Sequence, residues 1–145
     1  MVSAPLRVRK PEADSKARLR LWVRLLRASR LIESAARERL KSQFNATLPR
    51  FDVMAALYRQ PDGMLMSEIS RFLMVSNGNV TGIVDRLVSE GIVVRSQRDG
   101  DRRTSFIRLT RKGHAAFAEM AAAHERWVDE LLGSVSMRDA EHLSA

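Results

Sequence analysis

The sequence contains no cysteine. This absence excludes disulfide bonds, thiolate metal ligands, cysteine nucleophiles and any sensing of oxidation through a cysteine side chain. We therefore expect none of these chemistries in the function.

Long apolar runs are missing as well. Residues 1–16 lack the apolar core of about 7 to 15 residues that a signal peptide needs, and no later stretch approaches the roughly 18 apolar residues of a transmembrane helix. We therefore expect a cytoplasmic protein without a membrane partner.

Signals of enzymatic chemistry are also absent. His114, His124 and His142 are far apart in the sequence, and there is no Gly-rich phosphate loop or nucleophile elbow. The nearest approach to a metal site is His124 with Glu125 and Asp129, which side chains on a helix surface explain better. We expect no catalytic residues, no metal and no cofactor.

The sequence has an excess of positive charge. Its 145 residues suit one domain and carry 25 Lys and Arg against 17 Asp and Glu, which gives a net charge of +8 and a pI near 11.1. Such a balance favours a polyanionic partner such as nucleic acid. By itself it does not distinguish among DNA, RNA and a membrane surface.

The first part of the chain predicts a mobile basic arm over residues 1–14, followed by a long helix over residues 15–43, which lack Gly and Pro. A wide apolar stripe runs along this helix, formed by Leu19, Leu21, Trp22, Val23, Leu25, Leu26, Ala28, Ile32 and Ala35. Such a stripe suits burial from two sides, by its own domain and by another subunit. Packing in one core alone would also account for it.

Three helices are predicted between residues 49 and 90 by apolar residues at helical spacing. The first, 49–59, ends at the turn 61–63, the second begins at a Ser67 cap, and the third covers residues 77–90 after a Ser76 cap. The last two match the buried positions of a helix-turn-helix at Ile69, Leu73, Val80, Ile83 and Val84. Met74 stands where many such motifs carry glycine.

The predicted helix over residues 77–90 has two glycines on its outer face. If Val80 is buried, then Gly78, Gly82 and Asp85 are exposed, and the polar residues beside them are Asn79, Thr81 and Arg86. Each exposed glycine costs about 1 kcal/mol relative to alanine. Close approach of a nucleic-acid groove would compensate, because the missing side chains let polar neighbours reach bases and phosphates. The alternative is a weakly optimised surface helix.

Two strand-like segments, 92–94 and 104–109, enclose a charged turn at Gly100. Seven basic residues lie in and around them, against Asp99 and Asp101: Arg95, Arg98, Arg102, Arg103, Arg108, Arg111 and Lys112. A hairpin directly after such a helix is a wing, whose arginines can enter a narrow minor groove. Asp101 would pair with an arginine and hold the tip. A solvated charged hairpin is the alternative interpretation.

The C-terminal segment predicts two more helices. Thr110 can cap a helix from Arg111 to about Leu132 that Gly133 ends, and residues 136–139 resemble a capping box for another. The last helix runs to Ala145 without a stop signal, so we expect that the chain is cut short there.

One motif resembles a known family. Asp101, Arg103, Leu109, Thr110 and Gly113 match the D-x-R-x-x-x-x-x-L-T-x-x-G signature of the MarR family of winged-helix transcription regulators. The chain resembles this family over nearly its whole length. The resemblance implies a mainly α fold with a small β-hairpin wing, in which a winged helix-turn-helix (residues 47–110) is flanked by dimerisation helices (15–46 and 111–145). It also implies a homodimer on a pseudo-palindromic operator in double-stranded DNA.

Carried over residue by residue, the resemblance assigns DNA contacts to two places. On the recognition helix they are Ser76, Asn77, Asn79, Thr81 and Arg86. In the wing they are Arg98, Arg102 and Arg103, with Asp101 as organiser. Which of Arg102 and Arg103 enters the groove stays open.

The resemblance also implies a repressor released by a small aromatic anion, such as an aromatic acid or its coenzyme A thioester. An aromatic slot can be lined by Trp22, Phe44, Phe51 and Met54, with Arg24, Arg30 or Arg50 meeting a carboxylate or phosphate. The alternative is that these apolar side chains belong to the core and these arginines to the surface.

Two other classes of function stay open. One is an architectural nucleic-acid-binding protein without a ligand switch, which would bind the backbone and little else. Asn77, Asn79 and Thr81 argue against it, because amides and hydroxyls can read base edges. In the other, a different protein binds the apolar stripe of the first helix.

Overall fold

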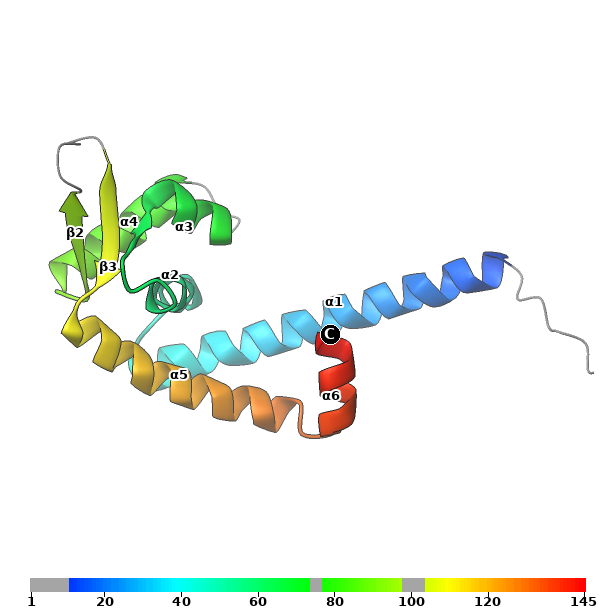
Figure 1. The fold of residues 1–145 in the computed structure, drawn as a ribbon. Coiled ribbons are helices and arrows are strands. Elements are labelled where there is room, and N and C mark those ends of the chain that lie inside the picture. Colours follow the sequence, from blue (N-terminus) through cyan, green and yellow to red (C-terminus); the bar gives the residue numbers. More distant parts are fainter. Residues whose placement is uncertain (1–10, 74–76, 98–103) are drawn as a thin grey trace, which may run out of the picture. The chain divides into compact units, whose positions relative to one another are not determined.

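The computed structural model describes residues 11–73, 77–97 and 104–145, which form helices and a small sheet (Figure 1). In chain order the elements are α1 (Pro11–Phe44), α2 (Leu48–Tyr58), β1 (Met64–Leu65), α3 (Met66–Leu73), α4 (Asn77–Ser89), β2 (Val93–Gln97), β3 (Ser105–Leu109), α5 (Arg111–Leu131) and α6 (Met137–Ser144). None of the described helices is both long and apolar enough to cross a membrane. The chain divides into two compact units within α1, between Ala35 and Ala36. We call residues 36–145 the lobe.

The smaller unit contains the part of α1 up to Ala35. Its apolar side chains are largely exposed, with Leu21, Trp22 and Leu25 at 58%, 59% and 56%. The helix begins at Pro11, so the predicted boundary at residue 15 is wrong and residues 11–14 do not belong to an arm. Proline fits a first helical position, and the acidic Glu12 and Asp14 of the first turn are stabilised by the helix dipole.

The core of the lobe is formed by α2, α3, α4, α5, the sheet and the last turns of α1. Its fully buried side chains include Leu40, Met54, Leu57, Ile69, Val80, Val84, Leu87 and Ile107. Leu73 and Ile83 pack against this cluster and are partly buried. The buried positions predicted for a helix-turn-helix are therefore confirmed, while its turn at residues 74–76 lies outside the described residues.

The sheet has three antiparallel strands in the order β1-β3-β2. The predicted pairing of the two strands is confirmed, with Val93 opposite Leu109 and Gln97 opposite Ser105, whereas the turn predicted at Gly100 lies outside the described residues. We did not predict β1, which is too short to show a strand period. It leads directly into α3, so Ser67 lies in the first turn of that helix and not at its cap. The carboxylate of Glu68 instead accepts a hydrogen bond from the backbone N–H of Leu65, at 2.8 Å.

Capping residues fix the junctions around the sheet. After α4 the chain turns at Gly91, whose φ of +73° suits glycine. The Thr110 hydroxyl accepts a hydrogen bond from the N–H of Gly113 at 3.0 Å and donates one to the Gly91 carbonyl at 2.7 Å. Ser136 caps α6 by accepting a hydrogen bond from the N–H of Asp139. The caps predicted at Thr110 and Ser136 are thus confirmed.

Candidate nucleic-acid interface

The outer face of α4 is polar and carries two glycines without neighbouring side chains. Gly78 and Gly82 lie one turn apart on it, and a Cβ atom added to either would meet no neighbouring atom within 4 Å. Asn79, Thr81 and Arg86 are exposed on the same helix. Since Val80, Val84 and Leu87 are buried on the other side, the predicted division of this helix into a buried apolar face and an exposed glycine-bearing face is confirmed.

Asp85 is an acid on this outer face. It forms an ion pair with Arg95 of β2, in which both side chains are partly exposed. Helix α4 is therefore joined by a charged contact to the strand that leads towards the predicted wing.

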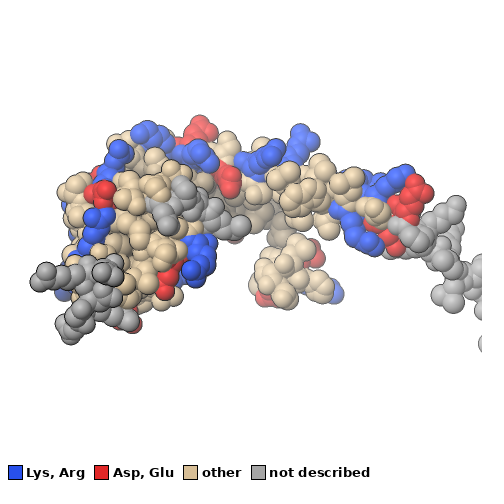
Figure 2. Space-filling model, turned by 90° about the horizontal axis from the view of Figure 1, so that it is seen from above, with Lys and Arg blue, Asp and Glu red and all other residues tan. Residues whose placement is uncertain are grey.

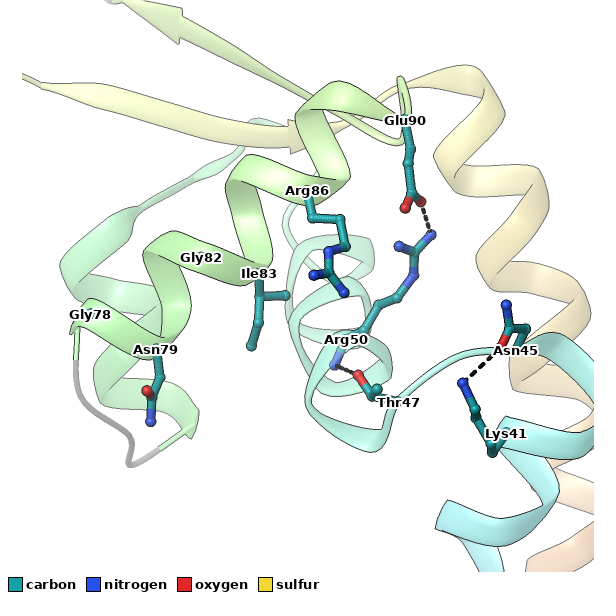
Figure 3. Close-up of a pocket in the computed structure, with 10 residues that line it drawn as sticks. All are labelled: Lys41, Asn45, Thr47, Arg50, Gly78, Asn79, Gly82, Ile83, Arg86 and Glu90. Atoms are coloured by element: carbon teal, nitrogen blue, oxygen red, sulfur yellow. Dashed lines mark hydrogen bonds and ion pairs between the residues drawn. The ribbon is translucent and has the colours of Figure 1, made fainter.

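A cavity of about 540 Å³ opens between α4 and the junction of α1 with α2 (Figure 3). From α4 it is lined by Gly78, Asn79, Gly82, Ile83 and Arg86, and from the other elements by Lys41, Asn45, Thr47, Arg50 and Glu90. Three cationic side chains thus line the cavity together with one carboxylate. This balance suits an anion.

Arg50 and Glu90 form an ion pair at the edge of this cavity, with 2.5 Å between the guanidinium nitrogen and the carboxylate oxygen (Figure 3). The hydrogen bond from Arg50 lowers the pKa of Glu90, and the positive charges of Arg50, Arg86 and Lys112 add to this against the opposing effect of burial. The Lys112 ammonium also donates to the Glu90 carbonyl, at 2.8 Å. These contacts hold the C-terminal end of α4 against α2 and α5.

A second cavity of about 580 Å³ adjoins the first and shares Lys41, Thr47, Asn79 and Ile83 with it. Its remaining lining is mainly apolar: Ala46, Leu48, Pro49 and Leu73, with Arg37 and Asp52. A mainly apolar cavity therefore lies beside a cationic one along α4.

Basic and acidic side chains are interspersed over the lobe. Figure 2, which looks down on the side that carries the hairpin, α3 and α4 in Figure 1, shows Lys and Arg side chains at several places, with Asp and Glu beside some of them. Pairing of an acid with a base, as in Asp85 with Arg95, lowers the local net charge.

The predicted DNA contacts fall into two groups. Asn79, Thr81 and Arg86 are each exposed on α4, and Asn77 is the first residue of that helix. Ser76 and the wing residues Arg98, Asp101, Arg102 and Arg103 lie outside the described residues. Their contacts stay predictions, although the two strands that lead to the wing tip are in place.

Phe51 and Met54, which are predicted to line an aromatic slot, are buried in the lobe, and their contact with a ligand stays a prediction. Both belong to the core, and the Phe51 ring lies 5.4 Å from Phe117 and 4.8 Å from His124 between ring centroids. The reason is that this face of α2 packs on α5. Phe44 lies beside Trp127, at 6.3 Å. This packing agrees with the core alternative for Phe51 and Met54, while Phe44 is partly buried.

The arginines and the tryptophan of the predicted ligand set are dispersed. Arg50 lines the cationic cavity. Trp22, Arg24 and Arg30 are exposed on α1 in the smaller unit, and their contact with a ligand stays a prediction.

Sequence analysis missed Lys41 and Glu90 as parts of the site. Lys41 lies beside the cavity where the chain turns at Asn45, whose φ of 50° is left-handed, and Thr47 then caps α2 by accepting from the N–H of Arg50. Glu90 follows the last residue of α4 and is held there by its ion pair with Arg50. An asparagine after the last turn of a long helix, followed by Thr-Leu-Pro, is the one local signal that could have predicted this turn.

His124 is not part of a metal site in the described ranges, where no group of three His, Cys, Asp or Glu is placed to hold a metal ion. Its ring packs beside Phe51 and Trp127. We expected a helix-surface side chain, and the structure instead buries it partly among aromatic rings.

Comparison with known proteins agrees with this architecture. The family model for the MarR family matches residues 46–105. The regulator PecS of Dickeya dadantii is 30% identical over 94% of this chain and 82% of its own, and the transcriptional activatory protein BadR of Rhodopseudomonas palustris is 29% identical over 90% and 77%. A MarR family regulator from Silicibacter pomeroyi has a crystal structure with a TM-score of 0.73, at 34% identity over 94% of this chain and 92% of that one. The chain belongs to the MarR family of DNA-binding transcriptional regulators.

Proposed function

We propose that the protein is a repressor that binds a pseudo-palindromic operator as a homodimer and is released by a small aromatic anion. The observation that carries this proposal is the placement of the cationic cavity on the outer face of α4. An occupant of that cavity covers the side chains that would read DNA, so ligand and duplex compete for one surface.

Roles on DNA follow from side-chain chemistry. The amide of Asn79 can pair with a base edge in the major groove, whereas the Arg86 guanidinium at the cavity suits a phosphate. Asn77 and Thr81 extend the polar set along the same helix. Arg98, Arg102 and Arg103 complete the proposal as contacts of the wing, with Asp101 as their organiser.

The exposed apolar side chains support self-association. On α1 they include Leu19, Leu21, Trp22, Val23, Leu25 and Leu31, and near the C-terminus Leu131, Leu132, Val135, Met137 and Leu143. Covering such side chains with a second copy removes them from water. Sedimentation should give a dimer for the wild type and a folded monomer for Leu21→Asp combined with Leu25→Asp. A wild type that stays monomeric at micromolar concentration would refute this part.

The two adjoining cavities favour a ligand with an apolar body and an anionic group. A ring would lie near Leu48, Pro49 and Ile83, and its carboxylate near Lys41, Arg50 or Arg86. Only a ligand that prefers the DNA-free protein can release the operator. An aromatic acid meets this condition by blocking α4, and its coenzyme A thioester adds phosphates for the same cations.

The test is a selection of bound sequences from random duplexes, followed by a screen of aromatic acids and their thioesters for release. We expect a two-fold symmetric consensus with half-sites about 34 Å apart and a released complex at submillimolar ligand. Binding without any preferred sequence would indicate an architectural protein instead. A promoter reporter then gives the direction of regulation, which is reduced transcription if the proposal is correct.

A further inference from the structure

Asp85 is out of place on a surface that binds DNA. It shares the exposed side of α4 with Gly78 and Gly82, so that it faces the side from which a duplex would approach. A carboxylate there repels phosphates. Its presence therefore needs a reason beyond DNA contact itself.

Stability of the fold does not supply the reason. The side chains of Asp85 and Arg95 are 55% and 42% exposed. Ion pairs this exposed to water add little to folding stability, because water screens the attraction and ordering two side chains costs entropy.

The position of Arg95 does supply one. Arg95 is exposed on β2 opposite Ile107 of β3, at the base of the hairpin that leads to the predicted wing. Its guanidinium has N–H donors in excess of what one carboxylate can accept. Free in water, this long side chain would sample many rotamers, but the ion pair fixes it between the helix and the hairpin.

We propose that Asp85 is a positioning residue for DNA binding, which holds the Arg95 guanidinium between α4 and the wing so that its remaining donors meet the phosphate backbone between the two grooves. The proposal rests on the DNA-binding function of the family. It does not depend on the operator, the ligand or the direction of regulation, because a phosphate contact carries no sequence information.

The test uses the change in DNA affinity of Asp85→Asn, for which the positioning role and simple charge repulsion predict opposite signs. Asp85→Asn removes a negative charge from the DNA-facing side. If Asp85 only repelled phosphates, the variant would therefore bind DNA more tightly than the wild type. Our proposal requires the opposite, a loss of about tenfold, which lies within the coupling range of residues in one ion-pair network. The charge-matched control is Glu125→Gln, at an exposed acid on α5, which should leave affinity equal or slightly raised.

The probe is a fluorescein-labelled duplex of mixed sequence at low salt, measured by anisotropy across a salt series. Arg95→Ala should weaken binding and reduce the log-log salt slope by about 0.9, the value for one lost phosphate contact. Asp85→Asn should reduce the slope in the same direction. In the Arg95→Ala background it should no longer weaken binding, while the melting temperatures of all four proteins stay close together.

Tighter binding by Asp85→Asn, or additive losses in the double variant, would overturn the positioning role. If the wild type shows no sequence preference, the proposed operator is refuted. The comparison of the Asp85 and Arg95 variants still tests the positioning role, since the mixed-sequence duplex reports backbone contacts alone.

Discussion

Gly113 in α5 and Gly82 in α4 are both helical glycines of the lobe, but their surroundings differ. A Cβ atom on Gly113 would lie 2.1 Å from the carbonyl oxygen of Ile92, whereas one on Gly82 would meet nothing within 4 Å. The first glycine is required by packing inside the chain. The second is not required by any described contact, although glycine destabilises a helix interior. A helical glycine that the fold does not need is consistent with a requirement from outside the chain, and the proposed function assigns that requirement on α4 to DNA.

The largest expected effect is that of Gly113→Ala. The added methyl group would collide with backbone, which cannot move without disturbing the bonds of Thr110 to the carbonyls of Gly91 and Ile92. We expect a loss of about 3 kcal/mol, at the upper end for overpacking, seen as a lower denaturation midpoint in urea. The control is Ala115→Gly at an exposed position of α5, which costs about 1 kcal/mol. If Gly113→Ala were less destabilising than Ala115→Gly, the close approach of Gly113 to the Ile92 carbonyl would be disproved.

Asn79→Ala tests what the outer face of α4 reads. We expect a change in which duplexes are preferred, with about 1–3 kcal/mol of discrimination lost at one base pair, because an amide can pair with a base edge. Selection from random duplexes measures this. Arg86→Ala is the matched comparison and should weaken binding to all duplexes about evenly. Equal behaviour of the two variants would mean that α4 contacts backbone only.

Gly82→Ala should move stability and binding in opposite directions. Alanine raises helix propensity by about 1 kcal/mol and meets no neighbour, so the melting temperature should rise by a few degrees. The same methyl group stands between α4 and the duplex, so we expect DNA affinity to fall by about tenfold. A stabilised variant with unchanged affinity would show that DNA does not approach this face closely.

The helices and the hairpin could be predicted from the sequence because their signals are local. Apolar spacing placed Val80 and Val84 in the core, and Thr110 and Ser136 fell at caps where a hydroxyl can accept a backbone N–H. The strand β1 could not be predicted, since Met64 and Leu65 form a strand only through pairing with Ile107 and Phe106 on β3.

The site was less predictable than the fold. The polar face of α4 follows from one helical period, so Asn79 and Arg86 could be identified from their spacing alone. The burial of Phe51 and Met54 could not be predicted in the same way, because it depends on where α5 packs. Charged pairs such as Arg50 with Glu90 join residues that are far apart in the sequence. Helical or strand spacing does not predict such contacts.

The smallest expected effect is a change in stability when the ion pair of Arg50 with Glu90, at the C-terminal end of α4, is removed. The pKa of Glu90 lies below its ordinary value of 4.5 in the folded protein, chiefly because Arg50 donates a hydrogen bond to the carboxylate. The lowered pKa means that the pair stabilises the fold above the unfolded pKa and that this contribution is lost as the pH falls through the folded one. Glu90→Gln should therefore lower stability by about 0.2–1 kcal/mol near neutral pH, since the pair is partly exposed. The difference from the wild type should shrink as the pH falls below the unfolded pKa and vanish once the carboxyl is protonated in the folded protein, measured by urea midpoints at each pH. A difference that persists in acid would assign the effect to packing of the side chain and not to its charge.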